Sequence, residues 1–122
     1  MNEPGRKKIL ICDDEEGIRE SFKLILADDY ELDFVATGPE AIDRLKASNP
    51  DAMILDIKMP KMHGFDVLKK IKSIKPKLPV IIVTGYQSVE MAQEATRLGA
   101  ADYIPKPFET AQIRRAVNNS LG

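Results

Sequence analysis

Two hydrophobic patterns alternate along the chain. Short apolar runs rich in β-branched residues, typical of buried strands, occur at 8–12, 32–36, 52–57, 79–84 and 102–105. Between them lie stretches with helical periodicity, such as Ile18, Phe22 and Ile25, which share one helix face. Five strand–helix units with short connections predict a doubly wound, five-stranded parallel sheet with helices on both faces, a three-layer α/β/α fold.

Polar residues and glycine mark the expected helix ends. Thr37 and Glu40 have the spacing of a capping box, with Pro39 in the first helical turn. Ser88 fits an N-cap, and Gly99 follows a helical stretch where a C-terminal glycine is expected. The fifth apolar run is short and has polar neighbours, which predicts an edge strand.

Length and charge limit the functions that this chain can have. Its 122 residues, 43% of them hydrophobic, fit a single domain over 1–122 with about 7–120 structured. With 18 basic and 19 acidic residues, the chain has no positive excess, so we expect no direct binding to nucleic acid or membranes. No stretch approaches the roughly 20 apolar residues of a membrane span, and Cys12 lies in an apolar run. We therefore expect a soluble cytoplasmic protein with a buried thiol.

Charged and hydroxyl side chains follow the predicted strands. They are Asp13 and Asp14 after the first, Asp56 in the third, Thr84 in the fourth and Lys106 after the fifth. The carboxyl ends of parallel strands share one edge, where such folds bind their ligands. Gathered carboxylates repel one another unless a cation joins them, which predicts a Mg²⁺ site with Mn²⁺ able to substitute. A hydroxyl and an ammonium beside that cation suit a phosphoryl group.

Four segments together carry a family resemblance. They are "ILICDDEEGIR", "AMILDIKMPKMHGFDVL", "PVIIVTGY" and "GAADYIPKPF", in this order. The chain resembles the receiver domain of bacterial two-component response regulators over essentially its whole length, and the segment from Thr84 to Phe108 is most similar to receivers of the nitrogen-regulator class. The resemblance implies a flavodoxin-like, CheY-like (βα)5 fold. It also implies either a stand-alone receiver or a fragment of a longer regulator.

The resemblance assigns a role to each strand-end residue. Asp56 would be the phosphoacceptor, which takes a phosphoryl group from a sensor histidine kinase or a histidine phosphotransfer protein. Asp13 and Asp14 would hold Mg²⁺ together with Asp56 and the main-chain carbonyl of Lys58. Thr84 and Lys106 would bind the phosphoryl oxygens, and the Lys106–Pro107 peptide bond would be cis. Apart from its own phosphorylation and dephosphorylation, such a module is not an enzyme.

The same resemblance implies a switch and a control on lifetime. Thr84 and Tyr103 would move together on phosphorylation and change the surface of the fourth helix, fifth strand and fifth helix, which binds an effector domain or protein or a second protomer. From periodicity alone, Tyr103 is equally well an edge-strand aromatic with its hydroxyl in water. Lys58 and Tyr86 would flank the path of attacking water, and we expect Tyr86 to slow hydrolysis.

Three other functions fit the residues less well. A haloacid-dehalogenase-type enzyme requires a second Asp two residues after the first, where this chain has Lys58. A flavin-binding flavodoxin requires a phosphate loop with hydroxyls and glycine, whereas "DDEEG" would repel a phosphate. A receiver that acts unphosphorylated would lack an acid, the Thr or the Lys. Glu15 and Glu16 are interpreted only as acids that favour the start of a helix, outside the essential set.

Overall fold

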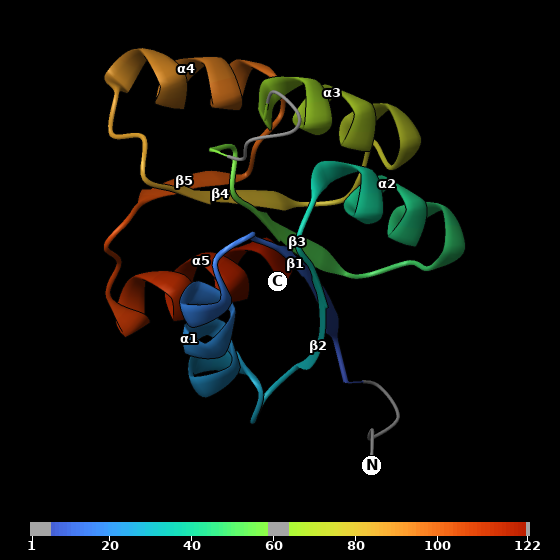
Figure 1. Cartoon of the computed structure of the whole chain (residues 1–122), viewed down its shortest axis with the longest axis vertical. Coiled ribbons are helices and arrows are strands. Elements are labelled where there is room, and N and C mark those ends of the chain that lie inside the picture. Colours follow the sequence, from blue (N-terminus) through green and yellow to red (C-terminus); the bar gives the residue numbers. More distant parts are fainter. Residues whose placement is uncertain (1–5, 59–63, 122) are drawn as a thin grey trace.

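Five parallel strands form one sheet in the order β2-β1-β3-β4-β5 (Figure 1). The structure is a computed structural model that describes residues 6–58 and 64–121. Within these residues the strands are β1 (Lys8–Cys12), β2 (Glu31–Val35), β3 (Ala52–Leu55), β4 (Val80–Thr84) and β5 (Asp102–Pro105). The predicted doubly wound fold is confirmed, with β5 at an edge. Strand β3 ends at Leu55, two residues earlier than predicted, and Asp56 and Ile57 lie in the loop that follows it.

Helices cover both faces of the sheet (Figure 1). They are α1 (Glu16–Leu26), α2 (Gly38–Ala47), α3 (Gly64–Ile74), α4 (Val89–Arg97) and α5 (Thr110–Leu121). Helices α1 and α5 lie on one side, and α2, α3 and α4 lie on the other. Among residues 6–58 and 64–121, no helix combines the length and apolar character needed to cross a membrane.

The core has two halves because successive strand residues point to opposite faces of the sheet. On β1, Ile9 and Ile11 pack with Phe22 of α1 in one buried cluster. Leu10 and Cys12 pack in the other cluster, which lies toward α2 and α3. These β1 side chains are at most 1% exposed. Burial on both faces holds the ends of the central strands in fixed positions.

The predicted helix ends are present in the structure. The Thr37 hydroxyl accepts a hydrogen bond from the Glu40 main-chain N–H at 3.2 Å and begins α2. Ser88 caps α4 in the same way through the main-chain N–H of Met91. Gly99 has a φ of 101°, a left-handed conformation that favours glycine just beyond a helix. Local sequence signals therefore fix where the loops leave the helices.

Candidate functional site

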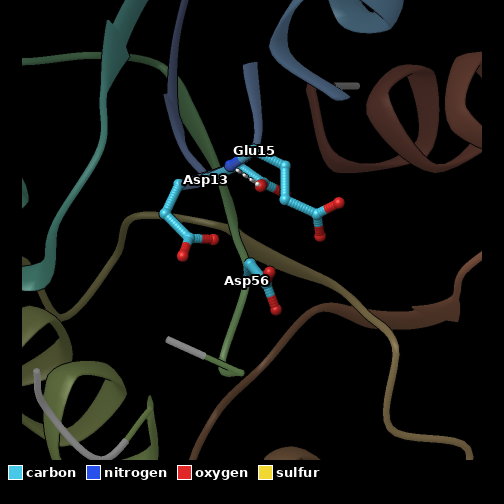
Figure 2. Close-up of side chains that lie close together, drawn as sticks. Asp13, Glu15 and Asp56 are labelled. Carbon is cyan, nitrogen blue, oxygen red and sulfur yellow. Dashed lines mark hydrogen bonds between the residues drawn. The ribbon is translucent and has the colours of Figure 1, made fainter. Parts of the chain in front are cut away.

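A cluster of carboxylates lies at the carboxyl edge of the sheet. Asp13 follows β1 and Asp56 follows the neighbouring β3, and they are 1% and 2% exposed. Asp14 and Glu15 extend the cluster toward solvent. One carboxylate oxygen from each of these four residues lies within 4.8 Å of the others. Figure 2 shows Asp13, Glu15 and Asp56 gathered at this edge.

The loops after β1 and β3 orient the two buried carboxylates in the same way. The main-chain N–H of Glu15 donates to Asp13 Oδ1 at 2.9 Å, and the main-chain N–H of Lys58 donates to Asp56 Oδ1 at 2.8 Å. Each is an Asx turn, in which a carboxylate binds the backbone two residues on. The second oxygen, Oδ2, of each carboxylate is left for the centre of the cluster.

The Lys106 ammonium lies among these carboxylates. Its Nζ is 2.9 Å from Asp13 Oδ2, 3.0 Å from Asp56 Oδ2 and 3.1 Å from Glu15 Oε1. The Lys106–Pro107 peptide bond is cis. The Lys106 main-chain N–H donates to the Thr84 carbonyl at 2.7 Å, which ties this loop to the end of β4.

The loop that carries Lys106 is also attached to α1. Two residues beyond the lysine, the Phe108 ring stacks on the Phe22 ring of α1 with their centroids 5.2 Å apart. Gln87 Nε2 also donates a hydrogen bond of 2.8 Å to the Lys106 carbonyl. These contacts hold the lysine backbone while its long side chain extends to the carboxylates.

Burial and charge act in opposite directions on these groups. Burial raises the pKa of Asp13, although the Glu15 N–H and the Lys106 ammonium both stabilise its ionised form. Burial alone would lower the pKa of Lys106, but hydrogen bonds to Asp13 and Asp56 raise the pKa overall. The lysine therefore stays charged at neutral pH. The cluster holds four carboxyl groups, and the one Lys106 ammonium contacts three of them, so the acids outnumber the cation at the site.

This donor set fits a divalent cation that prefers oxygen ligands. Asp13, Asp14, Glu15 and Asp56 offer only carboxylate oxygens, the ligand type of Mg²⁺ and Mn²⁺. The neighbouring Cys12 has a different role, because burial raises the pKa of its thiol to about 12, with the Asp13 charge adding to the effect. Cys12 is a buried, protonated core side chain, as the apolar run predicted.

Thr84 and Tyr103 are linked through Tyr86. Thr84 is the last residue of β4 and is fully buried, and its hydroxyl accepts a hydrogen bond from the Tyr86 main-chain N–H at 3.4 Å. The half-buried Tyr103 donates its hydroxyl to the Tyr86 carbonyl at 2.9 Å. The Tyr103 hydroxyl therefore has a main-chain partner just after the end of β4, and its role as a switch residue stays a prediction. Burial raises the pKa of Tyr103, and the Asp56 charge adds to this.

Lys58 and Tyr86 each lie two residues after a site residue, Asp56 and Thr84 respectively. The Lys58 ammonium lies 5.4 Å from the centroid of the Tyr86 ring, a cation–π arrangement. Gly85 lies between Thr84 and Tyr86, and a Cβ there would be 3.7 Å from Lys58 Cδ, an ordinary contact distance. The two side chains predicted to flank the site are thus in contact with each other.

Glu15 is the site residue that sequence reasoning missed. We interpreted it only as an acid at a helix start, and it does precede α1 as the N-cap residue. Its carboxylate nevertheless contacts Lys106, a residue 91 positions away. The sequence did contain a signal for Glu15 as a site residue, because it is a third acid directly after two predicted metal ligands. The direction of its side chain depended on the turn that Asp13 forms.

Fold and site define an α/β domain with a carboxylate cluster, a hydroxyl and a lysine at the ends of adjacent parallel strands. Residues 9–118 match the family model of the response regulator receiver domain, and the chain belongs to this family. The resemblance to receiver domains is therefore confirmed. Receiver domains act in two-component phosphorelay signalling.

Individual relatives agree with this membership. The chain is 39% identical over 122 residues to sporulation initiation phosphotransferase F of Bacillus subtilis. This match covers 99% of this chain and 95% of that protein. It is 36% identical to the regulatory protein AtoC of Escherichia coli, over 93% of this chain but 25% of that protein. A CheY-like receiver domain structure from Methanospirillum hungatei matches with a TM-score of 0.90 and 33% identity, over 96% of this chain and 94% of that one. Similar domains thus occur both nearly alone and as parts of longer regulators.

Proposed function

We propose that Asp56 accepts a phosphoryl group from a phosphohistidine of a sensor histidine kinase or histidine phosphotransfer protein. The observation that carries this proposal is the pair of buried, aligned carboxylates with one shared lysine. A carboxylate oxygen of Asp56 attacks the phosphorus as the P–N bond of the donor breaks, and the donor histidine is released. The Asp56 carboxylate is itself the nucleophile and has no hydroxyl or thiol proton to lose, so the step requires no general base.

The surrounding side chains support this transfer. Asp13, Asp14 and Asp56, with the main-chain carbonyl of Lys58, would hold Mg²⁺ or Mn²⁺, which when bound offsets the negative charge of the carboxylates and the phosphoryl group. Lys106 already contacts Asp56 Oδ2 and is close enough to turn to a phosphoryl oxygen. Thr84 supplies a hydroxyl at the neighbouring strand end.

The signal would leave the site through Thr84 and Tyr103. The main chain of Tyr86 bonds to both side chains, so a movement of the Thr84 hydroxyl toward the phosphoryl group changes the support of Tyr103. The surface formed by α4, β5 and α5 then favours an effector domain or protein, or a second protomer in a phosphorylation-dependent homodimer. Lys58 and Tyr86 would set the lifetime of the phosphorylated form.

In this proposal the chain is one receiver domain over 1–122 that acts in the cytoplasm without binding nucleic acid or membranes. It catalyses only its own phosphorylation and dephosphorylation. The acidic site edge and the balanced charge of the chain support the absence of nucleic-acid and membrane binding, since neither attracts a polyanion. Whether the domain stands alone or precedes an output domain decides only how the signal leaves it.

The test is phosphorylation by acetyl phosphate in the presence of Mg²⁺. Intact-protein mass spectrometry should detect one adduct of about 80 Da that is lost in base. Asp56→Asn, or removal of Mg²⁺ by a chelator, should abolish it. Asp66→Asn, at an exposed acid of α3, should leave it unchanged. An adduct that persists in Asp56→Asn would show that the phosphoacceptor is wrong.

A further inference from the structure

The Lys106 ammonium is held by carboxylates that the proposed function also requires to bind a cation. In the described part of the chain it has three carboxylate partners, Asp13, Asp56 and Glu15. Asp13 and Asp56 are proposed metal ligands, and the same Oδ2 atoms that contact the lysine face the centre of the site. When these oxygens turn to a cation, the lysine loses its two buried partners.

Glu15 differs from the other two partners in its surroundings. Its side chain is 60% exposed, whereas those of Asp13 and Asp56 are 2% exposed. Its main chain is fixed by the hydrogen bond to Asp13 Oδ1, but within the described residues its side chain makes no capping hydrogen bond to α1. The carboxylate can therefore follow the lysine over a short distance at little cost.

We propose that Glu15 is a positioning residue that retains Lys106 at the site when Asp13 and Asp56 release it to bind the cation. This inference rests on the proposed function, because it takes Asp13 and Asp56 as metal ligands. Without Glu15, cation binding would leave the ammonium with no carboxylate partner in this cluster. Glu15 thus makes the exchange of partners easier and increases affinity for Mg²⁺.

Three variants separate contact from charge. Glu15→Gln removes the charge and keeps the shape of the side chain. Glu15→Asp keeps the charge but shortens the side chain by one methylene, which takes the carboxylate away from Lys106. Glu16→Gln makes the same charge change one residue further on, at an exposed acid that makes no contact with Lys106 among the described residues.

The first measurement is Mg²⁺ affinity without any phosphodonor, by titration followed through amide chemical shifts of ¹⁵N-labelled protein. We expect Glu15→Gln and Glu15→Asp to weaken Mg²⁺ binding by about two- to fivefold, the effect of losing one partly exposed ion pair. Glu16→Gln should change the affinity by less than about twofold, since it affects only the more distant field.

The second measurement is the rate of phosphorylation by acetyl phosphate across Mg²⁺ concentrations. Both Glu15 variants should require more Mg²⁺ for half-maximal rate, while the rate at saturating Mg²⁺ stays within about twofold of the unmodified protein. A merely structural role would also lower the rate at saturating Mg²⁺. Urea unfolding without Mg²⁺ should show that both variants remain folded.

Two results would overturn the role of Glu15. If Glu15→Asp binds Mg²⁺ as tightly as the unmodified protein, local charge rather than the contact with Lys106 sets the affinity. If Glu15→Gln and Glu16→Gln weaken binding equally, the position of Glu15 has no special effect. Neither result depends on phosphorylation, so failure of this inference is distinct from failure of the Asp56 assignment.

Discussion

Replacing Lys106 by Met should destabilise the metal-free protein in a pH-dependent way. The substitution keeps most of the side-chain volume but removes the ammonium that lies 2.9 Å from Asp13 and 3.0 Å from Asp56. At an effective dielectric constant of about 20, each such contact corresponds to roughly 5 kcal/mol of Coulomb energy. The Asp13 and Asp56 side chains would remain 2% exposed without a cation beside them.

Protonation limits the loss of stability. A carboxyl group with an ordinary pKa of about 3.9 can be protonated at pH 7 for about 4 kcal/mol, so each of the two carboxylates can add no more than this to the loss. Water reaches the cluster on the side of Asp14 and Glu15 and reduces the effect further. We expect a decrease of about 2–3 kcal/mol in the free energy of unfolding at pH 7.

The sign of the pH dependence follows from the same groups. Burial already raises the pKa of Asp13, and removing Lys106 takes away an interaction that lowers it. A carboxyl group whose pKa is higher in the folded state than in the unfolded state makes the protein less stable as pH rises through that interval. The loss caused by Lys106→Met should therefore be smaller at pH 5 than at pH 7.

Urea unfolding followed by far-ultraviolet circular dichroism provides the assay. At pH 7 the midpoint of Lys106→Met should fall by about 1–2 M. Lys77→Met, at an exposed lysine in the loop between α3 and β4, should change stability by less than about 0.5 kcal/mol. Equal stability of Lys106→Met and the unmodified protein at pH 7, or an equal loss at pH 5 and pH 7, would refute this account of the cluster.

Two further predictions concern packing and lifetime. Gly64→Ala should destabilise the protein by about 3 kcal/mol or more in urea unfolding, because the new Cβ would lie 2.2 Å from Ile57 Cβ and 2.3 Å from its Cα. Gly17→Ala is the matched control, since a Cβ there has nothing within 4 Å and α1 should gain about 0.5–1 kcal/mol; equal effects of the two variants would contradict the close contact. Tyr86→Ala should speed loss of the Asp56 phosphoryl group several-fold by opening a path for water, whereas Tyr86→Phe retains the ring over Lys58 and should match the unmodified protein. Decay of the phosphorylated form by mass spectrometry measures this, and unchanged or slower decay in Tyr86→Ala would exclude a shielding role.

Much of the fold could be predicted because its signals are local. The apolar pattern along β1 and the caps Thr37 and Ser88 act within a few residues, so they can be recognised without the tertiary structure. The gathering of Asp13, Asp56 and Lys106 was also predictable. In a parallel sheet the strand order and direction bring the carboxyl ends together, whatever the side chains do afterwards.

The sequence by itself therefore determined the layers of the fold, the edge that holds the site and the residue types present there. Tertiary structure alone decided which side chains make contact across long separations. Glu15 reaches Lys106 because the Asp13 turn directs it there, and the Tyr103 hydroxyl bonds to the Tyr86 carbonyl on the neighbouring strand's loop. Such contacts depend on rotamers and loop paths that respond to the whole packed molecule, and no local pattern of residues specifies them.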